Sequence, residues 1–360
     1  MEDAATRLTI DIIGQVVLDT DLHAQTTENE LVNAFRHSIT WTPKAGRWNP
    51  LVNFNPMRPI MTWWYKRTMD AYLGNVIDAR FASQRKLAFE KGGKHVIDLA
   101  LDEYQAQVAG NSVDMLASAP DQHFKKVVID NMKTFLFAGH DTTSSMICYV
   151  YHLLGLHPEH LARVRQEHDE VFGIDTSKAP GMIKGTPQLL NNLPYTLAVI
   201  KETLRIYPSA STLRMGSEDI SITHNGKIYA TTGFLVWVNN HALSRRADIF
   251  PSPDSFMPER FLPNAPIEIP RNAWRPFEKG PRNCIGQELA LLESKIIMVM
   301  TLRDFNMQTA IEEWEKEYGK SKESGKVDEV YGDKVYQILQ STAKPKEGMP
   351  MKVTRAALQT

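Results

Sequence analysis

Phe277-Glu278-Lys279-Gly280-Pro281-Arg282-Asn283-Cys284-Ile285-Gly286 is the most informative stretch of this 360-residue chain. Gly280 permits a tight turn, and Arg282 can pair with a carboxylate. Cys284 stands just before a predicted helix, where backbone N–H groups and the helix dipole stabilise a thiolate. Gly286 permits the close approach of a flat ligand. A lone cysteine is more often a small buried hydrophobic residue, but the full spacing Phe-x-x-Gly-x-Arg-x-Cys-x-Gly favours a ligand-binding cysteine.

The composition is that of a soluble globular protein, with 42% hydrophobic residues, 23% charged residues and a formal net charge of -1. This balance gives no overall attraction to nucleic acid or to an anionic membrane. The two cysteines, Cys148 and Cys284, cannot form a disulfide framework or a cysteine-rich zinc site, and they indicate a reduced compartment. The sequence has no phosphate-binding GxxxxGK[ST], strand-linked GxGxxG, HExxH or CxxCH motif. No apolar run is long enough to span a bilayer.

Helical patterns dominate residues 1–210, and strand patterns gather in residues 211–360. This order predicts a mainly helical α+β fold with a small segregated sheet. We expect one domain over 1–360, whose second part contains the sheet, the loop 277–286, a helix and the last strands. The longest helix is predicted over about 121–156, which corresponds to roughly 50 Å at 1.5 Å per residue.

The remaining elements follow from periodicity and from turn residues. A proline-rich loop is expected over 42–59, with a helix restarting at Trp63. Asn225-Gly226 predicts a hairpin turn. The other predicted elements are helices over 158–171, 193–207 and 286–302, strands over 220–223, 227–230 and 234–238, an exposed charged insertion over 312–329, and a last pair of strands over 336–340 and 349–353.

The middle of the long helix, Ala138-Gly139-His140-Asp141-Thr142-Thr143, is small and polar although apolar residues flank it. Gly139 costs about 1 kcal/mol relative to alanine inside a helix. Such a string alone usually marks a helix face turned to solvent. The apolar flanks and the unexplained glycine favour a functional role instead.

A second motif is Glu202-Thr203-Leu204-Arg205, which places Glu202 and Arg205 on one helix face. Most such pairs are exposed and contribute only a few tenths of a kcal/mol. A downstream segment, Pro258-Glu259-Arg260-Phe261, adds a further arginine.

These three motifs, in this order, resemble the cytochrome P450 family of haem-thiolate monooxygenases. The resemblance implies the P450 fold and a haem b cofactor whose iron takes Cys284 as its axial ligand. It implies that Phe277, Gly280 and Gly286 shape the haem-binding loop. Arg282 and, less directly, Arg214 would meet the haem propionates.

The resemblance also assigns roles to the other two motifs. Asp141 and Thr142 would deliver protons to the oxygen substrate. Glu202, Arg205 and Arg260 would form a buried network behind the haem, which suits the forked guanidinium groups.

The implied enzyme takes electrons from an NADPH-dependent reductase and oxidises an apolar small molecule, with no nucleic-acid partner. The ending Lys344–Pro350 resembles fungal members of secondary metabolism. The resemblance implies a location at the cytoplasmic face of the endoplasmic reticulum membrane. We expect this chain to lack the family's N-terminal anchor, first strands and first helices, because helical spacing of apolar residues begins almost at once, at Leu8, Ile12, Ile13, Val16 and Val17.

Two other readings stay open. The chain could be a haem-thiolate isomerase or dehydratase that needs no oxygen activation, although the Asp141-Thr142 pair argues against this. It could also be an inactive truncated remnant. Cys148 and His241 are expected to be structural, and no histidine shows the spacing of a metal ligand.

Overall fold

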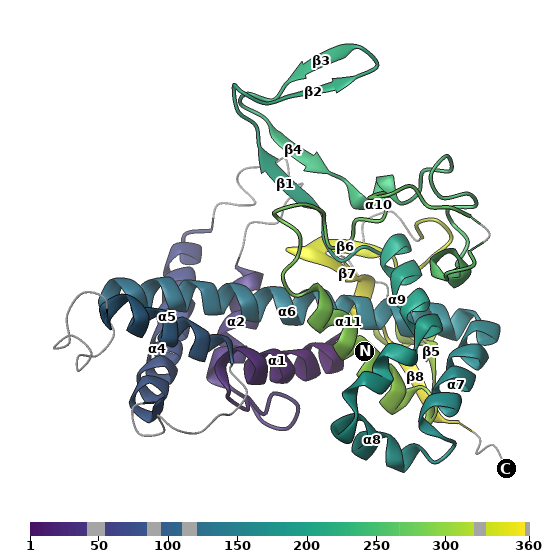
Figure 1. Ribbon diagram of the computed structural model, residues 1–360, viewed down its shortest axis with the longest axis horizontal. Coiled ribbons are helices and arrows are strands. Elements are labelled where there is room, and N and C mark those ends of the chain that lie inside the picture. Colours follow the sequence, from purple (N-terminus) through teal and green to yellow (C-terminus); the bar gives the residue numbers. More distant parts are fainter. Residues whose placement is uncertain (42–54, 85–94, 110–120, 266, 320–328, 357–360) are drawn as a thin grey trace. The chain divides into compact units, whose positions relative to one another are not determined.

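The computed structural model describes residues 1–41, 55–84, 95–109, 121–265, 267–319 and 329–356 (Figure 1). The chain divides into two compact units. One comprises residues 3–144 and 339–341, and the other comprises 1–2, 145–338 and 342–360. The prediction of a single domain over 1–360 stays a prediction.

The unit of residues 3–144 is helical. It contains α1 (Glu2–Leu18), α2 (Glu30–Thr40), α4 (Met57–Gln84), α5 (Val96–Ala109) and the first part of α6 (Gln122–Leu156). Asn29 begins α2, since its side-chain oxygen accepts hydrogen bonds from the backbone N–H groups of Leu31 (2.9 Å) and Val32 (3.3 Å). The fully buried side chains of this unit include Ile10, Leu31, Leu73, Ile77 and Ile97.

Helix α1 packs closely against α6. Thr9, Ile10 and Ile13 are buried on its inner face, whereas Leu8, Ile12 and Val16 are only half-buried. The Thr9 hydroxyl donates a hydrogen bond to the carbonyl of His140 on α6, at 3.1 Å. A Cβ atom added at Gly139 would lie 2.6 Å from Cγ1 of Ile13. The glycine in the polar middle of α6 is therefore explained by the contact between these two helices.

The unit of residues 145–338 contains the helices that the sequence predicts over 158–171, 193–207 and 286–302, and its described residues also form three short helices that were not predicted. Its helices are α7 (Pro158–Phe172), α8 (Ala179–Gly185), α9 (Pro194–Ile206), α10 (Asn240–Leu243), α11 (Gln287–Thr301) and α12 (Ile311–Tyr318). Short 3-10 turns cover 176–178, 187–192, 258–261 and 346–348. One apolar cluster of this unit joins Phe172, Ala179, Leu190, Leu193 and Val299.

The strands of this part form antiparallel pairs. Strand β1 (Thr212–Met215) pairs with β4 (Leu235–Val238), and β2 (Ser221–His224) pairs with β3 (Lys227–Ala230). Asn225 and Gly226, between β2 and β3, have φ angles of 48° and 74°. These left-handed angles are those that a two-residue hairpin turn requires, so the predicted hairpin is confirmed.

The predicted last pair of strands is wrong in its pairing. Strand β6 (Gln337–Gln340) pairs with β7 (Thr342–Pro345), because Ser341 takes a left-handed φ of 71° and turns the chain back at once. Strand β8 (Met351–Arg355) pairs instead with β5 (Phe305–Thr309), which the sequence reading did not predict.

Two predicted loops need correction. The charged stretch 312–329 is not a plain insertion, since α12 covers Ile311–Tyr318, and 320–328 lie outside the described residues. Most of the loop expected over 42–59 also lies outside them, and α4 begins at Met57 rather than at Trp63. Within the described ranges, every helix is too short or too polar to cross a bilayer.

The contact at Gly139 gives a first prediction. Gly139→Ala should destabilise the chain by about 1–3 kcal/mol, because the new Cβ overlaps a buried side chain and this outweighs the gain of about 1 kcal/mol in helix propensity. The measurement is the free energy of unfolding in urea. Adding Ile13→Ala should make the Gly139→Ala step neutral or stabilising. A Gly139→Ala variant more stable than the parent would contradict the packing described for α1 and α6.

Candidate active site

Cys284 lies at the end of a closed loop that leads into α11. Its backbone N–H donates to the carbonyl of Phe277 at 2.8 Å, and the N–H of Asn283 donates to that of Gly280 at 3.0 Å. Gly280 has a φ of 80°, in the left-handed region that favours glycine. These bonds hold the cysteine backbone in place just before Gln287, where the 15-residue helix begins.

The Cys284 side chain fits a haem bound through sulfur. Its thiol is exposed and not in a disulfide, and a thiolate is a ligand that haem iron accepts. A Cβ added at Gly286 would lie 3.9 Å from Sγ of Cys284. A side chain there would touch the sulfur, so glycine leaves the thiol more accessible to a ligand.

The two arginines expected at the propionates are both exposed. Arg214 lies on β1, and its Nη1 donates to the neighbouring carbonyl of Leu213 at 2.9 Å. Among the described residues, no acidic side chain forms an ion pair with Arg282 or Arg214. Both are therefore available to an anionic group, and their role at the haem stays a prediction.

An ion pair at the start of the loop was not predicted from the sequence. Arg275 Nε donates to Oε1 of Glu278 at 2.8 Å, and the Glu278 N–H donates back to the Arg275 carbonyl at 2.9 Å. Burial works to raise the pKa of Glu278, but its hydrogen bonds and charge contact with Arg275 outweigh this and lower it. The i, i+3 spacing of an arginine and a glutamate was the available signal.

Two further hydrogen bonds connect this segment to neighbouring helices. Trp274 Nε1 donates to the carbonyl of Lys201 on α9 at 3.0 Å, and Asn240 Nδ2 donates to that of Arg275 at 3.3 Å. The ring of Phe277 packs against Trp274, with centroids 5.9 Å apart. The cysteine loop therefore takes its position from α9 and α10.

The same helix α9 carries a fully buried carboxylate at Glu202. Its oxygens accept from Arg205 Nε (2.8 Å) and Nη2 (2.9 Å), from Arg260 Nε (3.2 Å), and from the N–H of Met257 (2.9 Å). The predicted association of Glu202, Arg205 and Arg260 is thus present in the structure. Such a carboxylate is stable in the interior only because every side of it meets a donor.

The guanidinium groups extend this network into the irregular segment 244–255. Arg205 uses its remaining N–H donors on three backbone carbonyls, those of Ser244 (2.9 Å), Pro253 (2.6 Å) and Ser255 (3.1 Å). Arg260 Nη2 donates to the carbonyl of Ser252 at 2.8 Å. Burial lowers the pKa of Arg260, and the charge of Glu202 opposes that shift.

Asp141 and Thr142 belong to the unit of residues 3–144. Asp141 is fully buried, and Thr142 is half-buried. The Thr142 hydroxyl donates to the carbonyl of Ala138, one turn earlier in α6, at 2.7 Å. The role of this acid and this alcohol in proton transfer stays a prediction.

Cys148 and His241 have structural surroundings, as expected. Cys148 is fully buried, and burial raises the pKa of its thiol to about 12. His241 Nδ1 lies 3.1 Å from Arg245 Nη1, and burial lowers the pKa of this histidine to about 4.

A family model described as Cytochrome P450 matches residues 1–325. The chain is 40% identical to cytochrome P450 monooxygenase acrF of Aspergillus aculeatus, over 98% of this chain and 72% of that protein. It is 36% identical to cytochrome P450 monooxygenase polC of Polytolypa hystricis, over 97% of this chain and 62% of that protein. The chain therefore spans about two thirds of the length of these relatives.

The solved structures that resemble this one show the same fold. The haem domain of cytochrome P450DA superimposes with a TM-score of 0.73 at 21% identity, over 99% of this chain and 68% of that chain. A cyanobacterial CYP120A1 with bound retinoic acid superimposes with a TM-score of 0.69 at 21% identity, over 99% of this chain and 69% of that chain. The predicted mainly helical α+β architecture is confirmed by these matches.

The buried carboxylate gives a second prediction. Glu202→Gln should destabilise the unit by about 3–5 kcal/mol, because it leaves two buried guanidinium groups without a countercharge. That loss is a large share of an ordinary stability of about 5–15 kcal/mol. The measurement is urea unfolding followed by circular dichroism.

The matched control is Glu312→Gln, which removes an ion pair with Lys334 whose N···O distance is 2.6 Å but which lies on the surface. It should leave the unfolding midpoint close to that of the parent. Equal midpoints for Glu202→Gln and Glu312→Gln would contradict the role given to the buried network.

Proposed function

The chain belongs to the cytochrome P450 family, and on this basis we propose that its Cys284 thiolate binds the iron of haem b in a monooxygenase. The observation that carries the proposal is the exposed Cys284 thiol, in a loop closed by its own N–H on Phe277 and with Gly286 beside the sulfur. A haem with a thiolate ligand supplies the reductive activation of dioxygen.

The residues of this chain bind and orient the haem in the proposal. Cys284 supplies the sulfur ligand, while Phe277, Gly280 and Gly286 shape the loop. Arg282 and Arg214 offer guanidinium groups to the propionates, a pairing supported by their exposure and by the forked geometry of arginine.

Asp141 and Thr142 move protons in the proposal. The Thr142 hydroxyl donates to Ala138 within the helix. Its hydrogen can turn about the Cβ–Oγ1 bond, so the same hydroxyl can also donate elsewhere. The buried carboxyl group of Asp141 is the nearest acid in the sequence that can replace that proton.

The partners are proposed from the family and not from the geometry. Electrons would come from an NADPH-dependent reductase, and the substrate would be an apolar small molecule of fungal secondary metabolism. We place the reaction at the cytoplasmic face of the endoplasmic reticulum membrane. Oxidation that depends on the reductase would support this function, and turnover without any reductase would support a haem-thiolate isomerase instead.

The ligand assignment gives a third prediction. Cys284→Ala should abolish the red-shifted carbon monoxide band of ferrous thiolate haem, whatever haem the variant retains. Cys148→Ala should keep that band, because burial raises the pKa of the Cys148 thiol to about 12 and leaves it protonated. A carbon monoxide difference spectrum measures both. The assignment fails if the band survives in Cys284→Ala.

The proton path gives a fourth prediction. With reductase and an oxidised substrate, Thr142→Ala should retain substrate binding but divert a larger share of the electrons to peroxide and water. The measurement is product formed per NADPH consumed. Thr134→Ala is the matched control, since the exposed Thr134 hydroxyl donates to the carbonyl of Asp130 in the same helix, at 2.9 Å. Thr142 has no part in the reaction if both variants couple electrons to product as the parent does.

A further inference from the structure

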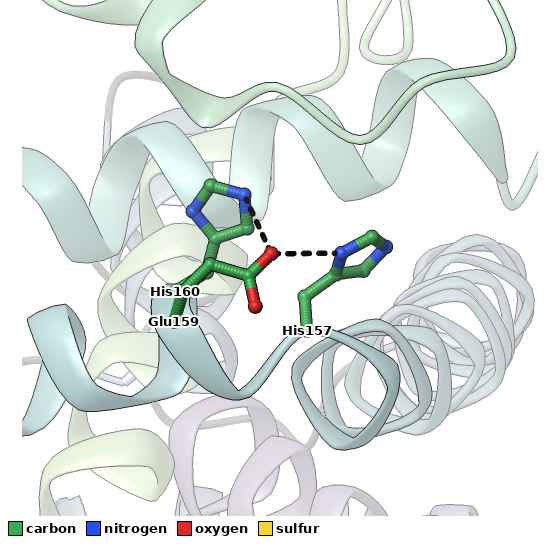
Figure 2. A group of neighbouring side chains, drawn as sticks. All are labelled: His157, Glu159 and His160. Atoms are coloured by element: carbon green, nitrogen blue, oxygen red, sulfur yellow. Dashed lines mark hydrogen bonds and ion pairs between the residues drawn. The ribbon is translucent and has the colours of Figure 1, made fainter.

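Three side chains with metal-binding atoms meet where α6 ends and α7 begins. His157 follows the last residue of α6, and Glu159 and His160 lie in the first turn of α7. Figure 2 shows the Glu159 carboxylate between the two imidazole rings, each of which turns a nitrogen toward the same oxygen. The sequence predicted no metal-ligand spacing at these residues, and their proximity is a finding of the structure.

The distances suit a small metal ion. His157 Nδ1 lies 3.3 Å and His160 Nε2 lies 3.9 Å from Oε1 of Glu159, and the three ligand atoms lie within 4.8 Å of one another. Zinc bonds of about 2.0–2.2 Å in a tetrahedron place neighbouring ligand atoms roughly 3.3–3.6 Å apart. A bound ion therefore needs only a small inward movement of these side chains.

A second residue fixes the orientation of the His160 ring. His160 Nδ1 lies 2.6 Å from the Tyr195 hydroxyl, which donates to Oε1 of Glu259 at 3.2 Å. A carboxylate only accepts hydrogen bonds, so the phenol donates to Glu259 and accepts from His160 Nδ1–H. The lone pair of His160 then lies on Nε2, the atom that faces Glu159. Metal-binding histidines are commonly oriented in this way.

The cluster is open to solvent, so an ion can enter. His157, Glu159 and His160 line a cavity of about 730 Å³, which leaves room for water as a fourth ligand. Arg163, one turn further along α7, does not oppose a cation strongly, because it pairs with Glu259 at 2.8 Å. The ordinary alternative is that Glu159 only complements the dipole of α7. That role does not account for two imidazole nitrogens directed at one carboxylate oxygen.

We propose that His157, Glu159 and His160 form a binding site for a divalent transition metal, with zinc as the preferred ion. Two imidazoles and one carboxylate are a ligand set that zinc accepts, with one position left for water. The site is independent of the haem proposal, since none of its residues belongs to the cysteine loop or to the network of Glu202.

The test is isothermal titration of the full chain, without an affinity tag, with zinc chloride. It is run in the parent and in a Cys284→Ala background, because the exposed thiol can bind zinc itself. We expect one zinc ion per chain in the Cys284→Ala background. Glu159→Gln and His160→Gln should each weaken binding at least tenfold, and Tyr195→Phe should weaken it about tenfold through the lost orientation of His160.

The matched control is His224→Gln, which removes an exposed imidazole on β2 and should leave zinc affinity unchanged. Glu159 is exposed, so its substitution should not disturb folding, and circular dichroism without zinc checks this. Zinc affinity in Glu159→Gln and His160→Gln equal to that of their background would overturn the proposal. So would the absence of binding at micromolar zinc. Loss of the thiolate spectrum in Cys284→Ala would leave the zinc result unaffected.

Discussion

The unit of residues 145–338 depends on the ion pairs and hydrogen bonds of the buried Glu202 carboxylate. A fully buried negative charge is costly unless donors surround it. Here two guanidinium groups and the Met257 N–H meet both of its oxygens. Through Arg205 the same charge orders the carbonyls of Ser244, Pro253 and Ser255, in a segment with little regular structure of its own. In the segment 244–255, hydrogen bonds from this ionic cluster therefore hold a backbone that has little helix or strand structure.

The position of the cysteine loop depends on the same helix, α9. Helix α9 carries Glu202, and the Lys201 carbonyl beside it accepts the indole N–H of Trp274. From Trp274 the chain continues to Phe277, whose carbonyl accepts the Cys284 N–H. The thiol is thus exposed, while hydrogen bonds hold the backbone at Trp274 and at Cys284. This combination allows a cysteine to be both reachable and fixed in position, as an axial ligand requires.

The sequence predicted the parts of this protein that depend on local rules. Pro158 and Asn225-Gly226 marked the start of α7 and the hairpin of β2 and β3, since each restricts the backbone where it stands. The spacing around Cys284 indicated a turn before a helix, and the pair Glu202-Arg205 indicated an ion pair on one helix face; the structure has both. The features that the sequence did not predict depend on contacts between residues distant in the sequence. The pairing of β5 with β8 is one case, and the contact of Gly139 with Ile13 is another. The cluster of His157, Glu159 and His160 was not predicted because His157 lies between two helices, where helical spacing does not indicate the direction of its side chain.

Cys284 is the residue that we propose supplies a thiolate to haem iron. Electron paramagnetic resonance of the ferric, haem-loaded chain tests this directly, with Cys148→Ala used so that Cys284 is the sole cysteine. The account predicts the rhombic low-spin signal of a haem with one thiolate ligand. A signal from a haem with two nitrogen ligands would contradict it.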